Sequence, residues 1–154
     1  MQTDPSAADL AERSMSLAVK KSARALTKRR GGEVDENPAR VLALAIAQAG
    51  LDKKALDVEI IDVTGKVDYA DYVVVMSATS DRQANAIAKH IDSELSRQGM
   101  HAHSIEGLPQ GAWVLIDYGD VIVHIFHQDT RGYYDLESLW YDAARVDVVD
   151  QKRA

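Results

Sequence analysis

Two parts of this chain are apolar at almost every position: YVVVM at residues 72–76, and the paired runs WVLI and VIVHIF that flank Asp117–Asp120. A strand with one wet face alternates apolar and polar residues, whereas a continuous apolar run is typical of a strand buried on both faces. The first run predicts such a strand over residues 71–78. The second predicts a hairpin over residues 113–126, because Gly119 supplies the positive φ that a tight turn requires.

Helical patterns flank these strands. Asn37 is a good N-cap with Pro38 at the first helical position, and Gly50 is expected to end the helix that follows. A second amphipathic helix is predicted over residues 79–99, with Thr79 or Ser80 as its cap and Gly99 at its end. Its apolar stripe comprises Ala84, Ile87, Ala88, Ile91 and Leu95.

The remaining elements complete an α-β-β-α-β-β-β-α order. Residues 56–64 alternate as a strand, residues 100–107 form a short edge strand, and residues 130–140 form a last helix. On that helix one face is expected to pack on the sheet through Tyr133, Leu136, Leu139 and Trp140. The order predicts an α/β (mixed α+β) fold, with a mixed sheet of about five strands packed with helices.

The chain length of 154 residues fits one domain with extensions. Residues 1–36 are predicted to be a flexible, locally basic N-terminal extension, because RRGGEVDEN breaks any helix and apolar periodicity is thin. The folded domain is expected over residues 37–148, followed by a C-terminal tail at residues 149–154.

Charge is divided unevenly between these parts. Residues 1–36 hold seven of the 18 Lys and Arg and six of the 24 Asp and Glu, so the remainder holds 11 basic and 18 acidic residues. An acidic body repels phosphate and disfavours direct binding of RNA or DNA, whereas it attracts a basic protein. A weak RNA contact by the basic extension stays open.

Cysteine is absent, which excludes disulfides and zinc-thiolate sites. No run approaches the roughly 18 apolar residues of a membrane span, and the N-terminus lacks the order of a secretory signal. We therefore expect a cytoplasmic protein.

Residues suited to catalysis do not assemble into a recognisable pattern. Asp117 and Asp120 have the odd spacing of turn residues rather than of a shared metal site, and a buried His124 is expected to be a hydrogen-bonded core residue. The loop SATSDRQ could cradle an anion, but it has no glycine and no P-loop lysine. We predict no enzyme activity, no metal and no cofactor.

Large aromatic side chains gather between residues 113 and 141, where both tryptophans and the sole phenylalanine lie. Trp113 beside an acidic turn has the composition of a protein-protein interface, where Trp and Tyr are enriched. Packing of Trp113 in the core is the alternative, because large aromatics are usually buried. Both interpretations stay open at this point.

Three blocks of the sequence resemble the ribosomal silencing factor family (RsfS, also called Iojap): DYVVVMSATSDRQ, WVLIDYGDVIVHIF and YYDLESLWYDAARV. They occur in family-like order and spacing over about residues 38–148. The chain departs from the pattern at Ala78, where the family commonly has glycine, which weakens any anion-binding role for that loop.

The resemblance implies a nucleotidyltransferase-like fold without the catalytic acids, usually in a homodimer. It implies binding to the large ribosomal subunit through large-subunit ribosomal protein fourteen, a steric block to joining of the small subunit, and repression of translation when nutrients are scarce. In the resemblance the hairpin block carries the contact, with Trp113 as the aromatic anchor and Tyr118, beside Gly119, as the second apolar contact at the turn. From their charge alone, Asp117 and Asp120 are expected to face Lys or Arg of the partner. The alternative function is a nucleotide-binding enzyme of nucleotidyltransferase type.

Overall fold

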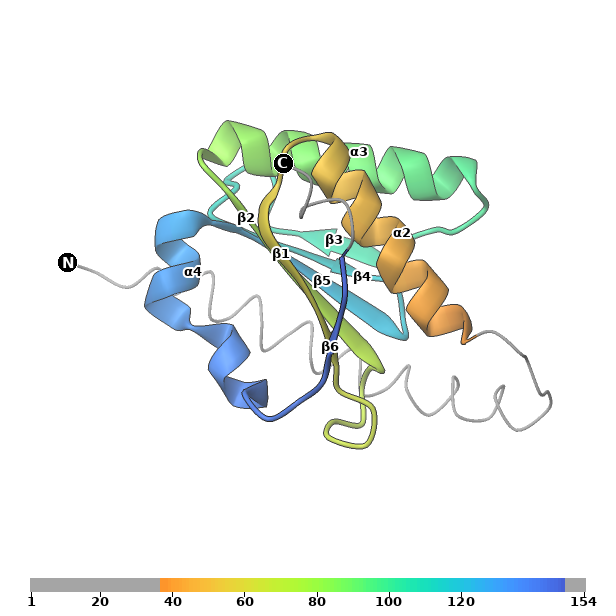
Figure 1. Cartoon of the computed structure of the whole chain (residues 1–154). Coiled ribbons are helices and arrows are strands. Elements are labelled where there is room, and N and C mark those ends of the chain that lie inside the picture. The colour runs from red at the N-terminus through yellow and green to blue at the C-terminus, as the bar shows by residue number, and fades with distance from the viewer. Residues whose placement is uncertain (1–36, 149–154) are drawn as a thin grey trace.

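The computed structural model describes residues 37–148. The predictions for residues 1–36 and 149–154 lie outside the described residues. The described chain forms one six-stranded sheet of order β3-β4-β5-β2-β1-β6, with helices on both faces (Figure 1). Its elements are α2 (Pro38–Asp52), β1 (Leu56–Asp62), β2 (Tyr72–Ala78), α3 (Asp81–Arg97), β3 (Ser104–Glu106), β4 (Trp113–Asp117), β5 (Val121–His127), α4 (Gln128–Tyr134), the 3-10 helix η1 (Leu136–Trp140) and β6 (Arg145–Val146).

The sheet is mixed, as predicted. β2 and β5 lie parallel at its centre, and every other neighbouring pair is antiparallel. All residues of β2 and β4 are buried, and so are those of β5 except His127. The continuous apolar runs therefore mark strands covered on both faces, and the prediction from them is confirmed.

One face of the sheet packs against α2 and α3. Alternate strand residues such as Val74, Ile116 and Val123 meet the helical stripe of α3, which has the five members that its periodicity predicted. Ser80 is the cap of α3, and its Oγ accepts a hydrogen bond from the amide of Gln83. The Gln83 side chain in turn accepts a hydrogen bond from the amide of Thr79. These two backbone N–H groups at the start of α3 therefore find their acceptors within the same segment.

The opposite face is covered by α4 and η1. The intervening strand residues, among them Val75, Leu115 and Phe126, pack there against Leu136 and Trp140. Because side chains alternate along a strand, each strand contributes to both cores. We call residues 128–141, which comprise α4, η1 and the following Tyr141, the C-terminal cover.

The first helix begins as predicted and ends later than predicted. Asn37 Oδ1 accepts hydrogen bonds from the amides of Ala39 and Arg40, with Pro38 at the first helical position. Gly50 does not end α2, which continues to Asp52. A Cβ at Gly50 would lie 2.6 Å from Met76 Sδ, so this glycine allows the helix to approach β2 closely.

The C-terminal part differs from the prediction of one amphipathic helix. Asp135 adopts a left-handed conformation (φ 47°, ψ 51°), which separates α4 from η1 and changes the direction of the chain. Leu136 and Trp140 are buried as predicted, whereas Tyr133 and Leu139 are exposed. A sixth strand, β6, also follows; its two residues were too few to give a sequence signal.

Candidate functional site

The five residues predicted as a partner contact do not form one surface. Trp113 and Asp117 lie at the two ends of β4, and Trp113 belongs to the core beneath the C-terminal cover. Tyr118 belongs to the core on the α2–α3 face. Only Gly119 and Asp120, in the turn between β4 and β5, are partly exposed.

Trp113 is packed inside a cluster of rings. Its side chain is 5 % exposed, and its ring lies 4.7 Å from that of Phe126 and 4.9 Å from that of Tyr134 between ring centroids. Its indole Nε1–H donates a hydrogen bond of 2.9 Å to His124 Nδ1. The expectation that Trp113 projects as an exposed anchor is therefore wrong for this conformation, and the core alternative holds.

His124 is a buried, neutral histidine. Burial lowers the pKa of its imidazole to about 3, since a charge in this core would lose its hydration. Because Nδ1 accepts the indole proton, the imidazole proton sits on Nε2. The prediction of a hydrogen-bonded core histidine is confirmed, and His124 locks the orientation of the Trp113 ring.

The hairpin turn is held by its own polar groups. Asp117 is 1 % exposed, and its Oδ1 accepts a 2.7 Å hydrogen bond from the amide of Gly119, whose φ is 90°. The Asp120 carbonyl accepts hydrogen bonds from the amides of Asp71 and Tyr72. Asp117 therefore serves the turn and is buried away from a partner's Lys or Arg, while Asp120 is still accessible.

Tyr118 packs under α3 with its hydroxyl buried. Burial raises the pKa of this phenol, and the nearby carboxylate of Asp92 raises it further. The hydroxyl oxygen has no hydrogen-bond partner among the described residues. Tyr118 is thus a core residue of the α3 side rather than the exposed second contact that we expected.

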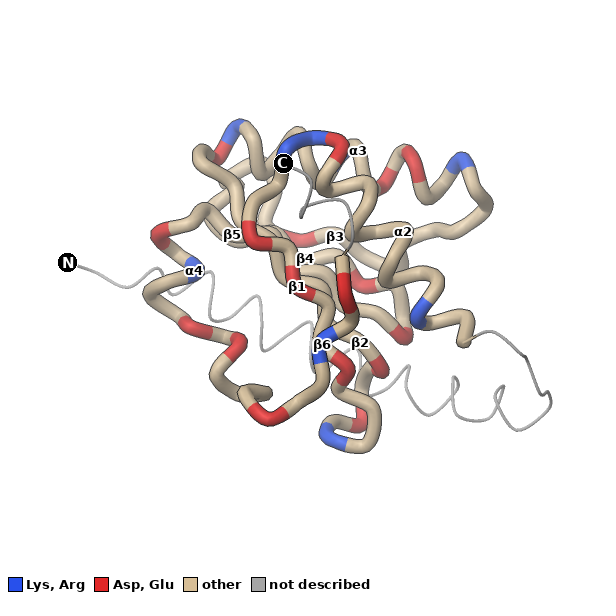
Figure 2. Tube along the Cα trace, viewed as in Figure 1, with Lys and Arg blue, Asp and Glu red and all other residues tan. Residues whose placement is uncertain are grey.

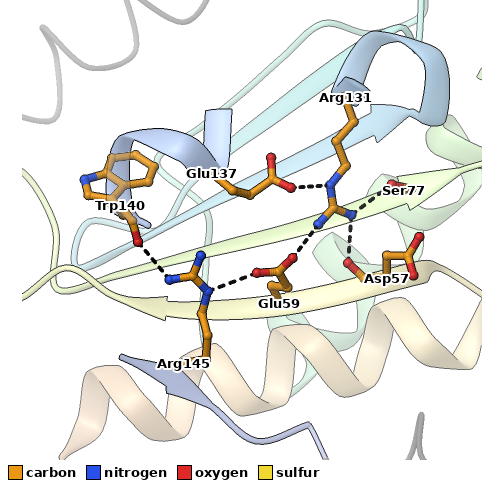
Figure 3. A network of polar contacts seen from close by, with 7 residues as sticks. All are labelled: Asp57, Glu59, Ser77, Arg131, Glu137, Trp140 and Arg145. Atoms are coloured by element: carbon orange, nitrogen blue, oxygen red, sulfur yellow. Dashed lines mark hydrogen bonds and ion pairs between the residues drawn. The ribbon is translucent and has the colours of Figure 1, made fainter. Parts of the chain in front are cut away.

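A polar network that the sequence did not predict fastens the C-terminal cover to the sheet (Figure 3). Arg131 of α4 is 8 % exposed, and its guanidinium bonds to Glu137 at 2.8 Å and to Glu59 of β1 at 3.2 Å. It also donates to Ser77 Oγ at 2.9 Å and to the Asp57 carbonyl at 2.7 Å. No local pattern reveals this network, because its members come from four separate segments.

Glu59 joins this network to the end of the described chain. Its second carboxylate oxygen accepts a 3.0 Å hydrogen bond from Arg145, which also donates to the carbonyl of Trp140 (Figure 3). Arg145 donates to the carbonyl of Ala143 as well. Two arginines and two glutamates are thereby paired across α4, η1, β1 and β6. Such partly buried pairs fix geometry, since each charge needs its partner once desolvated.

The outer side of the C-terminal cover exposes large apolar side chains. Tyr133, Leu139 and Tyr141 are 59 %, 64 % and 83 % exposed, and they make up three of the six exposed large apolar residues of the described chain. The other three are Val41, Leu44 and Leu56. The aromatic enrichment did signal this region, but it did not distinguish the buried rings from the exposed ones.

The loop considered for nucleotide binding has a structural role at the start of α3. The loop at Thr79 and Ser80 uses its side chains to cap α3. Within residues 37–148, no group of three or more His, Asp or Glu side chains is placed to hold a metal ion. In the same residues no helix is long and apolar enough to cross a membrane.

Comparison with known proteins agrees with this architecture. The family model described as "Ribosomal silencing factor during starvation" matches residues 36–154. The chain belongs to this family. A relative named ribosomal silencing factor RsfS from Bacillus subtilis is 40 % identical over 112 residues, covering 73 % of this chain and 94 % of that protein.

More distant relatives and solved structures extend the similarity. The chloroplastic protein Iojap of Zea mays is 29 % identical over 106 residues, which is 69 % of this chain and 46 % of that protein. A crystal structure from Bacillus halodurans matches with a TM-score of 0.61 and 39 % identity, covering 70 % of this chain and 97 % of that one. One from Chromobacterium violaceum matches with a TM-score of 0.65 and 31 % identity, covering 66 % and 85 %. The mixed α+β fold is thus shared with members of the silencing factor family.

Proposed function

We propose that this protein silences ribosomes by occlusion. It binds the large ribosomal subunit through the basic large-subunit ribosomal protein fourteen, blocks association with the small subunit, and represses translation under nutrient limitation or in stationary phase. The observation that carries the proposal is the family match over residues 36–154, together with curated relatives named as silencing factors. The protein acts in the cytoplasm in this proposal.

The charge of the chain supports a basic protein partner. Residues 37–154 hold 18 acidic against 11 basic residues, and Figure 2 shows acidic positions along α4, α3 and the strand ends. A negative surface attracts a cationic protein and repels the phosphates of RNA and DNA. The protein is thereby directed to the ribosomal protein rather than to the surrounding RNA, with at most a weak RNA contact by the basic residues of 1–36.

The proposal assigns no chemical reaction to the protein. The groups that a nucleotidyltransferase relative would need are used for structure: Asp117 binds its own turn, and Thr79, Ser80 and Gln83 cap α3. Among the five hairpin residues, Gly119 and Asp120 remain available for direct contact with the partner. Trp113, Asp117 and Tyr118 contribute by holding the surface in shape.

The decisive experiment mixes the purified full chain with isolated large and small ribosomal subunits. Sedimentation through a gradient is expected to show the protein with large subunits, and subunit pairing is expected to fall as more protein is added. Large subunits that pass through the gradient without the protein would refute the proposal. Calorimetry with ATP and Mg²⁺ is expected to show no binding, and micromolar binding would favour the enzyme instead.

The homodimer is part of the proposal and is tested separately. Sedimentation equilibrium of the free protein is expected to give twice the chain mass of 16.9 kDa at micromolar concentration. A mass that stays at one chain at all concentrations would remove the dimer from the proposal without affecting ribosome binding.

A further inference from the structure

The outer side of the C-terminal cover has the composition of a docking surface. Three large apolar side chains, Tyr133, Leu139 and Tyr141, are well exposed within nine consecutive residues. Exposed apolar residues that occur singly are ordinary, whereas a group of them rimmed by polar residues marks an interaction site. Tyrosine in particular supplies a large contact area at a low cost in conformational entropy.

The charge around these side chains selects the partner. Residues 128–142 contain four acids, Asp129, Asp135, Glu137 and Asp142, and Arg131 as the only base. Arg131 is buried and paired with Glu59 and Glu137, so it offers no positive charge to a partner. Asp129, with a side chain that is 91 % exposed, and the exposed Asp135 leave an acidic rim. In Figure 2 the chain is red, which marks Asp and Glu, at several positions along and after α4.

The segment that carries this exposed surface is held to the sheet by hydrogen bonds and ring contacts. Arg131 bonds to β1 and β2 from within α4, and Arg145 bonds to β1 and to the end of η1 (Figure 3). Tyr134 of the cover packs on Trp113 in the core beneath, and the Tyr133 ring meets the Tyr134 ring edge-on at 5.0 Å between centroids. A surface that is held in place before contact loses less entropy when it binds.

We infer that Tyr133, Leu139 and Tyr141, with the acidic rim at Asp129 and Asp135, form the surface that docks on a lysine- and arginine-rich protein surface of the large ribosomal subunit. This inference rests on the proposed function and moves its main contact from the hairpin to the C-terminal cover. The apolar side chains supply the buried centre of the interface, and the carboxylates at its rim pair with the cations of the partner.

The exposed apolar residues of α2 provide the natural comparison. Val41 and Leu44 are 47 % and 37 % exposed, one helical turn apart, but the nearest charged neighbour in sequence is Arg40. Judged by this nearest charge, that surface does not fit a cationic partner. The pair therefore serves as a control for the loss of two exposed apolar side chains.

The test compares two double variants in co-sedimentation with large subunits. Leu139→Ser with Tyr141→Ser is expected to weaken binding at least about tenfold, because a few central apolar residues dominate an interface. Val41→Ser with Leu44→Ser is expected to bind within about twofold of the unchanged protein. Both pairs are exposed, and matching thermal melts confirm that each variant is folded.

A charge variant identifies the chemistry of the partner. Asp129→Lys is expected to weaken binding, and more so at low salt, because it opposes a cationic surface. Stronger binding by this variant would indicate a phosphate contact and would overturn the inference.

The outcomes separate this inference from the proposed function. If the unchanged protein binds large subunits and the Leu139/Tyr141 variant binds equally well, the docking surface is wrong and the silencing function stands. If that variant loses its dimer in sedimentation equilibrium but keeps ribosome binding, the cover joins two copies of this chain and the inference is likewise overturned. If the unchanged protein does not bind, the proposed function itself fails.

Discussion

At the scale of single residues, Trp113 and His124 form a hydrogen-bonded pair inside the protein. The indole N–H of Trp113 donates a 2.9 Å hydrogen bond to the neutral imidazole of His124, and both side chains are almost fully buried. A buried polar atom without a hydrogen-bond partner costs stability. The hydrogen bond removes this cost for both the indole N–H and the imidazole Nδ1. The pair therefore belongs to the interior, where its contribution is to stability and to the shape of the cover above it.

Trp113→Ala is expected to lower the free energy of unfolding by about 3 to 5 kcal/mol, because it leaves a cavity among Phe126, Tyr134 and His124. Urea denaturation measures this loss. Trp113→Phe is the control: it keeps much of the volume and leaves His124 Nδ1 without its donor, so a smaller loss is expected. Unchanged stability of the alanine variant together with lost ribosome binding would return Trp113 to the role of an exposed anchor.

His124 is expected to make the fold sensitive to mild acid. Its pKa of about 3 in the folded protein lies below the ordinary value near 6.5, so the unfolded chain binds one more proton between these values. The stability that this group contributes is complete above pH 6.5 and is lost as the pH falls, at about 1.4 kcal/mol per pH unit.

Urea denaturation at pH 6 and pH 5 tests this slope, since most carboxylates stay ionised in that range. His124→Gln cannot titrate there, and its amide oxygen is able to accept the indole proton. The variant is expected to show a clearly shallower dependence on pH. An equal slope in both proteins would contradict a buried neutral His124.

At the scale of elements, the C-terminal cover is short and depends on tertiary contacts. α4 has seven residues and η1 has five, and helices of this length are not stable by themselves. Their stability comes from Leu136 and Trp140 in the core and from the arginine–glutamate network. The network therefore decides whether the cover, and any surface on it, keeps its shape.

Arg131→Met is expected to loosen the cover before the rest of the fold. It leaves Glu137 and Ser77 without this donor and Glu59 with Arg145 alone. Removing one partner of a buried charge pair costs about 3 to 5 kcal/mol, and the cost is expected to be smaller in this partly buried network. Hydrogen exchange is expected to become faster in residues 128–146, while α2 and α3 keep their protection. Thr130→Ala, on the same helix and outside the network, is the control. Uniform loss of protection across the sheet would mean that the network supports the whole fold equally.

At the scale of the whole molecule, the sheet is enclosed by two unequal layers. α2 and α3 form one cover and α4 with η1 forms the other, so all central strands are hidden (Figure 1). The acidic excess is carried on the outside of this enclosed body. Long-range attraction to a basic partner is therefore a property of the molecule rather than of one residue.

The rate of association with large subunits is expected to fall as salt rises, whereas the dissociation rate is expected to change little. Steering by net charge acts on encounter and is screened over a Debye length of about 8 Å at physiological ionic strength. Stopped-flow measurements over a range of salt concentrations test this expectation. A dissociation rate that carries most of the salt dependence would place the charges inside the interface instead.

The sequence by itself determined the elements whose signals are local. The continuous apolar runs predicted the doubly covered strands, the stripe of α3 predicted its buried face, and Asn37-Pro38 predicted the start of α2. The three sequence blocks indicated the family, which the comparisons confirmed. Each of these signals is read from residues within one element, where burial periodicity and capping chemistry are directly encoded.

Only the tertiary structure decided which aromatic side chains are buried and what holds the cover in place. Trp113 and Tyr133 are both large rings in an aromatic-rich region, yet Trp113 is buried because α4 crosses over it, and Tyr133 of α4 is exposed. The left-handed Asp135 separates Tyr133 from the buried Leu136 and Trp140 of η1, so the three do not share one helix face. The network of Arg131, Glu59 and Ser77 joins residues 54 and 72 positions apart in the sequence. Exposure and long-range pairing depend on how elements pack, and no local spacing encodes them.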